Sequence, residues 1–308
     1  MKRSQFAERQ YEAAVHIELA LGAASPFVPT QSIEAYIGID AAADPGNGHA
    51  IWRILSVQVP RRITLSTALW PALPRRFHDE IPGQLCSLFM QFKRPIYQDS
   101  CRAKYHSRIG GPYFEVGITG HQQEALLQLQ RRVKTSAVVR YASPAFWSRV
   151  DFDHHDGQRQ VLANSAFICP SQINMHRKWM YAGPNGRVIL NPEPVDADGE
   201  TWEAVVVEMT KVATRQTLRE HIRSLAQAIG NGGIPRERLG EISWLRRIGQ
   251  YGQFSEEDKA LLFDLSVVAL AAEAADATWV VMLLTEDGGK NLLSDDRGWM
   301  WPWPPRWW

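Results

Sequence analysis

The stretch Leu88-Phe89-Met90-Gln91-Phe92-Lys93-Arg94-Pro95 decides the fold, because an apolar run ends there in two polar residues and is then stopped by proline. The run predicts a short buried strand, and strand side chains alternate between two faces. Gln91 and Lys93 therefore share one face with Phe89. The opposite face is expected to be wholly apolar: Leu88, Met90 and Phe92. Burial of a lysine is costly unless an anion meets the ammonium, so a carboxylate or a metal-bound phosphate is expected opposite Lys93.

Composition places the chain among globular proteins without naming a partner. Its 308 residues are enough for one large domain or two smaller ones. The apolar share of 45% and the charged share of 22% are typical of soluble domains, and a net charge of +1 gives no general attraction to polyanions. The cysteines form no CxxC pair, the N-terminus has no signal-peptide apolar segment, and acidic residues interrupt the apolar run at 261–284. These features predict a cytoplasmic protein without a membrane span.

The order of elements outward from the decisive strand predicts the fold class. Before it come a helix over 5–21, an alternating strand over 31–41 that contains Asp40, a turn at 44–48, a returning strand over 50–59 and a Pro-rich insertion over 60–84. After it come a basic loop over 97–111, a helix over 121–133 and a strand over 137–141. This order predicts an α/β (α+β) fold whose mixed central sheet is flanked by helices.

The second half of the chain is expected to be mixed at first and then mainly helical. Strand-like pieces occur at 166–169 and 187–190, helices are predicted over 202–229, 236–248 and 256–276, and a last strand over 280–284. We therefore expect one domain over 1–145 and a second region over 146–308. The tail 299–308 is rich in tryptophan and proline, so it is expected to dock on its own domain, on a partner subunit or on a second copy of the chain.

Three parts of the first 145 residues together resemble the active site of the PD-(D/E)XK nuclease superfamily, closest to its Mrr-like restriction branch. They are Glu8 or Glu12 on the first helix, Asp40 at the end of a strand, and Gln91-Phe92-Lys93 on the next strand. In that family a first-helix Glu, a strand Asp and a Glu-x-Lys or Gln-x-Lys converge on a metal-bound phosphodiester. The chain departs from the family in the 51 positions that separate Asp40 from Gln91, which the Pro-rich insertion can absorb.

The resemblance implies a restriction-endonuclease-like core and a Mg²⁺- or Mn²⁺-dependent hydrolase of DNA phosphodiester bonds, acting in restriction or antiviral defence. It implies that Asp40, Gln91, Glu12 and Glu8 hold the metal ion, and that Lys93 orients the attacking water and offsets charge on the phosphate. Gln91 would supply only a neutral carbonyl oxygen. A helix-one carboxylate is therefore more necessary here than beside a strand glutamate.

Other interpretations of the same residues stay open. Asp79 is a rival to Asp40, although residues 74–84 lack a strand pattern. Glu8 and Glu12 also fit a solvated helix face, and Gln91 and Lys93 fit an edge pair that reaches solvent. A non-catalytic interaction subunit, which binds a partner through its C-terminal helices and Trp-rich tail, is the alternative function. The acidic and histidine-rich run 151–156 suits a divalent metal but better fits a solvated turn.

Overall fold

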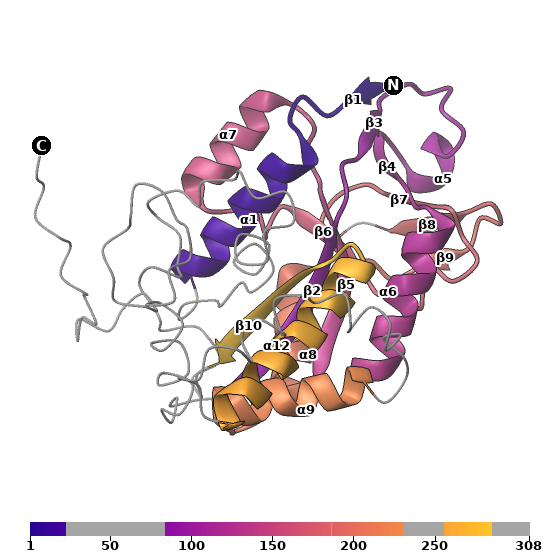
Figure 1. Ribbon diagram of the computed structural model, residues 1–308. Coiled ribbons are helices and arrows are strands. Elements are labelled where there is room, and N and C mark those ends of the chain that lie inside the picture. Colours follow the sequence, from indigo (N-terminus) through magenta and orange to yellow (C-terminus); the bar gives the residue numbers. More distant parts are fainter. Residues whose placement is uncertain (23–83, 186, 231–255, 285–308) are drawn as a thin grey trace, which may run out of the picture.

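The computed structural model describes residues 1–22, 84–185, 187–230 and 256–284, which form a mixed α+β architecture (Figure 1). Within these ranges no helix is both long and apolar enough to cross a membrane. The predicted hairpin over 31–59, the Pro-rich insertion, the helix over 236–248 and the tail over 299–308 lie outside the described residues.

A mixed sheet forms the centre of the described fold, as the order of elements predicted. Its strands follow the order β10-β2-β5-β6. β2 and β5 are parallel, whereas β10 and β6 are antiparallel to their neighbours. The bounds are β2 Gln84–Phe92, β5 Ala137–Pro144, β6 Ser165–Ile168 and β10 Thr278–Leu284.

The faces of β2 are the ones that its alternation predicts. Leu88, Met90 and Phe92 belong to one buried cluster, whereas Phe89 belongs to another on the opposite face of the sheet. Because both faces of β2 are covered, the three residues before Gln91 are all apolar. Gln91, near the end of β2, and Lys93, just after it, therefore lie on a face of the sheet that helices cover.

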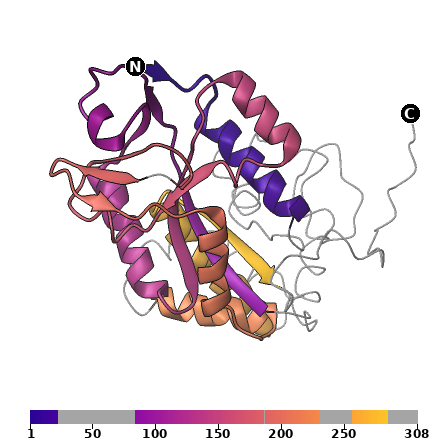
Figure 2. The same cartoon turned by 180° about the vertical axis from the view of Figure 1, so that it is seen from behind.

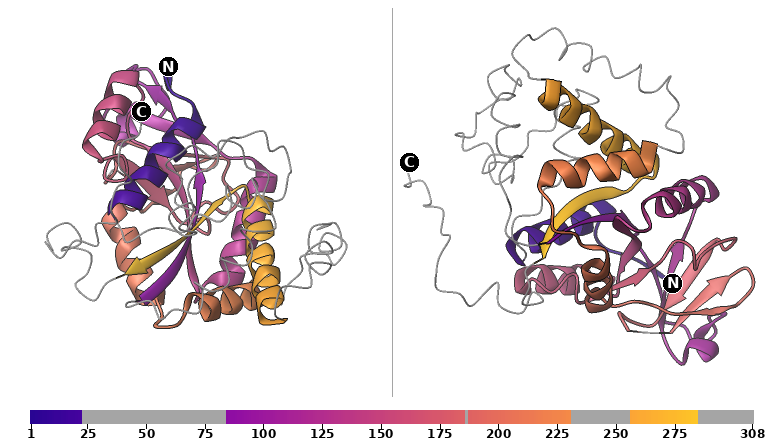
Figure 3. Two further views of the ribbon diagram at one scale, coloured as in Figure 1. Left: turned by 60° about the vertical axis from the view of Figure 1, so that its left-hand side comes forward. Right: turned by 90° about the horizontal axis from the view of Figure 1, so that it is seen from below.

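Helices cover both faces of the central sheet. One buried cluster joins the sheet to α1, α7 and α8, whose bounds are Glu8–Gly22, Arg149–Gln158 and Trp202–Val212. The other joins it to α6, α9 and α12, whose bounds are Gly120–Val133, Leu218–Gly230 and Glu256–Ala274. Figure 3 shows α9 and α12 on one side of β10 and α1, α7 and α8 on the other. The prediction of a mixed sheet flanked by helices is confirmed at this level.

A second sheet, antiparallel throughout, lies beside the central one (Figure 2). Its described strands, in sheet order, are β1 Lys2–Arg3, β3 Ile96–Gln98, β4 Tyr113–Gly117, β7 Lys178–Tyr181, β8 Val188–Asn191 and β9 Asp196–Ala197. The short helix α5 (His106–Ile109) precedes β4. Of these strands, only β8 had been predicted from the sequence, as the strand-like piece at 187–190. Strands this short, between Gly, Pro and Asn residues, contain too few alternations for a period to be recognised.

Residues on both sides of position 145 share the central sheet and its buried clusters. β10 pairs with β2 along its whole length, and α9 and α12 pack on the face that carries Phe89. In the described ranges after 145, strands β6 to β10 accompany the helices. The division into a domain over 1–145 and a mainly helical region stays a prediction.

A buried hydrogen-bond chain ties α9 to the centre of the sheet through His221, which is only 3% exposed. The Gln216 amide nitrogen lies 2.8 Å from Nδ1 and can only donate, so neutral His221 carries its proton on Nε2. Nε2 then donates to Ser87 Oγ at 2.8 Å, which also accepts from Trp279 Nε1 at 3.0 Å. Burial lowers the pKa of His221 to about 4.

This histidine is expected to make folding stability fall on acidification between about pH 6.5 and pH 4. In that window the unfolded chain, with an ordinary histidine pKa of about 6.5, binds a proton that folded His221 does not. The loss attributable to His221 is about 3 kcal/mol below pH 4. Urea unfolding of wild type and His221→Gln at pH 7.5, 6, 5 and 4.5 measures it. The variant is less stable at pH 7.5 but should show a flatter pH dependence, and equal slopes would contradict the assignment.

Candidate functional site

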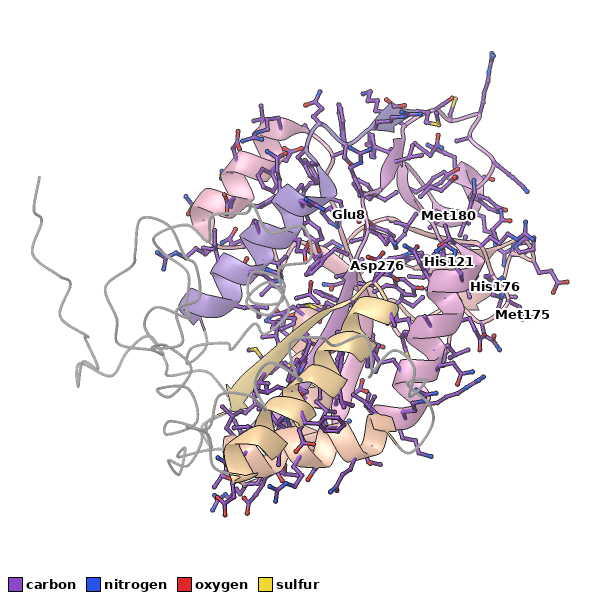
Figure 4. The ribbon with its side chains drawn as sticks, in the orientation of Figure 1. Glu8, His121, Met175, His176, Met180 and Asp276 are labelled. Carbon is purple, nitrogen blue, oxygen red and sulfur yellow. The ribbon has the colours of Figure 1, made fainter. Side chains whose placement is uncertain are left out.

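The candidate site lies where β2 ends. Because β2 is antiparallel to β10, the end of β2 meets the start of β10, and Met90 is registered with Thr278. β5 is parallel to β2, so Gln91 is registered with Tyr141 near the carboxyl end of β5. The first turns of α1 and α6 reach the same edge. Figure 4 labels Glu8 on α1 and Asp276 in the turn between α12 and β10, near the centre of the view.

Lys93 is the cation of the site and is only 8% exposed. Its Nζ donates to Gln122 Oε1 at 3.1 Å, and Gln122 Oε1 also accepts from Thr119 Oγ1 at 2.6 Å. Burial lowers the pKa of Lys93, while the negative charges of Glu8 and Asp276 act to raise it. These two carboxylates are therefore the described negative charges that act on Lys93, although its hydrogen bond goes to Gln122.

Gln91 is the most buried polar side chain of the site, with 1% of its surface exposed. Its amide nitrogen donates to Asp276 Oδ2 at 3.1 Å. Its carbonyl oxygen, Oε1, is buried and receives no hydrogen bond from the described residues. A buried acceptor without a donor costs free energy of about 1–3 kcal/mol, so this oxygen is suited to a ligand that supplies positive charge or a donor.

The helix-one acids reach the same edge of the sheet from α1. Glu8 Oε2 accepts a hydrogen bond from the backbone amide of Arg94 at 3.1 Å, directly after β2. Glu12 Oε1 accepts from the Thr278 hydroxyl at the start of β10. Both predicted acids thus touch residues that flank Gln91 and Lys93. Glu8 is itself exposed, as the interpretation of a solvated helix face expects, whereas Glu12 is half-buried.

The strand aspartate expected from the sequence is not placed, because Asp40 and its rival Asp79 both lie outside the described residues. The expectation that Asp40 meets Lys93 stays a prediction. In the part of the chain that the structure describes, no group of three His, Cys, Asp or Glu side chains is close enough to hold a metal ion. A carboxylate that the sequence analysis did not select, Asp276, faces Gln91 and Lys93 instead.

Sequence reasoning missed Asp276, Gln122, Thr119 and Tyr141. Gln122 Nε2 donates to Asp276 Oδ2 at 2.6 Å, which links α6 to the turn before β10. Burial and then the charge of Asp276 raise the pKa of Tyr141, whose hydroxyl donates to Gln123 Oε1 at 2.8 Å. A signal for Asp276 existed, since it separates a predicted helix from a predicted strand. The sequence did not indicate which strand pairs with β2.

Two other segments singled out in the sequence have ordinary structural roles. Residues 151–156 lie in helix α7, so the turn expected there is wrong: Ser148 caps the helix by accepting from the Asp151 amide at 3.0 Å. Asp153 pairs with Arg149 on the surface. In the basic segment 97–111, Arg108 pairs with Asp196 at 3.5 Å and the Lys104 ammonium lies over the Tyr105 ring.

Comparisons of the chain with protein-family models, with curated proteins and with solved structures find no match. The PD-(D/E)XK resemblance therefore rests on the residues themselves. Those that the structure describes are Glu8, Glu12, Gln91 and Lys93, which gather at one edge of a mixed sheet.

Proposed function

We propose that this chain is a metal-dependent endonuclease that hydrolyses DNA phosphodiester bonds in restriction or antiviral defence, on a restriction-endonuclease-like core. One observation carries the proposal. The nearly buried ammonium of Lys93 lies at the end of a strand that also carries the Gln91 carbonyl oxygen, which has no partner in the described ranges, and carboxylates from two other elements lie near it. Cations and hard oxygen donors at one point suit a phosphate diester, which carries negative charge and binds with metal ions.

Lys93 is the group that would act on the phosphate. Gln122 holds its Nζ by a hydrogen bond, and Glu8 and Asp276 favour its charged form against the effect of burial. A positioned ammonium in a site of low water content stabilises charge that develops on a phosphate oxygen more strongly than one in bulk water. The restricted environment of Lys93 therefore supports a role in the transition state of the hydrolysis.

The oxygen donors of the site are of the kind that Mg²⁺ and Mn²⁺ prefer. Gln91 Oε1 is a buried acceptor with no donor among the described residues, and Glu8 and Glu12 are carboxylates at the same edge. In our proposal Gln91, Glu12 and Glu8 hold the ion together with Asp40. When bound, the ion supplies polarisation of the scissile phosphate and a lower pKa for the attacking water.

The proposal is tested by cleavage of supercoiled plasmid DNA. Wild type is expected to nick and linearise the plasmid with Mg²⁺ or Mn²⁺ and to leave it intact with EDTA. Asp40→Ala should lose at least about a hundredfold in rate, because a carboxylate ligand is removed. Asp79→Ala is the matched control and should cleave like wild type.

Each outcome of this experiment decides between the two candidate functions. A metal-dependent loss with Asp79→Ala and not with Asp40→Ala would keep the nuclease and change the acid. Purified wild type that binds the plasmid or a partner but never cuts it, under either metal, would reject the nuclease. The non-catalytic interaction subunit would then be the better description.

A further inference from the structure

Asp276 occupies an uncommon backbone position at the edge of the candidate site. It lies in the turn between α12 and β10 with a φ of 50°, which is the left-handed region. Glycine adopts this region without steric cost, and asparagine and aspartate adopt it more readily than other residues because their short polar side chains can form local hydrogen bonds. The backbone therefore accepts Asp276, and the role of its carboxylate has to be judged from the contacts that the side chain makes.

The carboxylate of Asp276 determines how two amides are turned. Its Oδ2 accepts from Gln91 Nε2 at 3.1 Å and from Gln122 Nε2 at 2.6 Å. An ionised carboxylate can only accept, so both amides must present their NH₂ groups to it and turn their carbonyl oxygens away. The oxygen of Gln91 is thereby left buried and unpartnered among the described residues, and the oxygen of Gln122 is aimed at the Lys93 ammonium.

We infer that Asp276 is a positioning residue for both Gln91 and Lys93, acting on the first directly and on the second through the Gln122 amide. The roles of Gln91 and Lys93 in cleavage rest on the proposed function. The positions that Asp276 gives to the two side chains do not depend on that function. It also adds the turn between the last described helix and strand to a site whose members selected from the sequence all lie before residue 94.

The variants follow from the backbone of the turn. Asp276→Gly removes the side chain and suits a φ of 50°, so the fold should be kept or stabilised. Asp276→Asn also suits the backbone, and because both hydrogen bonds fall on one oxygen, its Oδ1 can still accept from both amides, so this variant removes mainly the negative charge. Gln122→Met removes the amide that links Asp276 to Lys93 and leaves Asp276 in place. Asp153→Asn, an exposed carboxylate on α7, is the matched control.

The first readout is the reactivity of the Lys93 amine in the absence of DNA and metal. Trace acetylation at pH 8 followed by mass spectrometry gives the labelling of Lys93 relative to Lys178, which pairs with Glu115 elsewhere. Asp276→Gly should raise this ratio at least about threefold, because Lys93 loses its held partner and a nearby negative charge that favours the ammonium. Asp276→Asn should raise it less, through the lost charge alone. Gln122→Met should raise it through the lost hydrogen bond.

The second readout is plasmid cleavage, in which Asp276→Gly should lose at least about tenfold in kcat with little change in KM, and Asp276→Asn should lose less. An unchanged labelling ratio in both variants would overturn the inference whatever they do to cleavage. An equal rise in Asp153→Asn would overturn it too, since the effect would then be unspecific. A wild type that does not cleave DNA rejects the proposed function, while the labelling ratios still decide the role of Asp276.

Discussion

Lys93→Met is expected to abolish metal-dependent DNA cleavage, with a loss of at least about a hundredfold in kcat. Methionine keeps an unbranched apolar stem of similar length but has no ammonium to place against the phosphate. The 8% exposure of Lys93 means that solvent cannot replace the missing charge at that point. The measurement is the rate of plasmid nicking at saturating DNA, with Mg²⁺ in excess.

The same substitution should leave the fold intact or make it more stable. Burial lowers the pKa of Lys93, which shows that the folded protein disfavours the ammonium, and methionine removes that cost. A thermal unfolding midpoint equal to or above that of wild type, together with lost cleavage, separates a chemical role from a structural one. Lys178→Met, at a surface ion pair, is the control and should alter neither quantity. Cleavage by Lys93→Met within threefold of wild type would exclude Lys93 from the chemistry.

The largest expected effect on stability comes from a charged cluster on the other face of the sheet. The Arg140 side chain in β5 is 3% exposed, and its Nε donates to Glu200 at 2.6 Å while a second nitrogen donates to Glu208 in α8. The double variant Glu200→Ala/Glu208→Ala leaves this guanidinium buried without a counter-charge. It is expected to lower the free energy of unfolding by about 3–5 kcal/mol.

Removing the arginine instead should cost much less. In Arg140→Met the two glutamates remain, but they are 18% and 43% exposed and can be solvated again. Urea unfolding of both variants measures the difference, with Glu203→Ala, an exposed acid in the first turn of α8, as a control that should change stability by no more than about 0.5 kcal/mol. Equal losses in the two variants would show that the hydrogen bonds, and not the buried charge, dominate the cluster.

Local sequence patterns predicted much of the central sheet. The alternation of Leu88, Met90 and Phe92 with Gln91 and Lys93 predicted which side chains of β2 share a face of the sheet. The helix over 121–133 and the strand over 137–141 correspond to α6 and β5 with small shifts of their ends. These elements are long and strongly periodic, so burial imposes its period on the residues. The helix predicted over 202–229 is two helices, α8 and α9, because an irregular link at 213–217 interrupts it.

The sequence by itself determined that a lysine ends a buried strand beside a glutamine and that a negative group must face it, because the desolvation cost of the ammonium follows from residue type and neighbours. Only the tertiary structure added Asp276 to Glu8, which the sequence had already indicated, as a source of that negative charge. Asp276 lies 185 positions from Gln91 and reaches it because β10 pairs antiparallel with β2. Strand pairing over such a distance is set by the packing of the whole core on both faces of the sheet, and no local period records it.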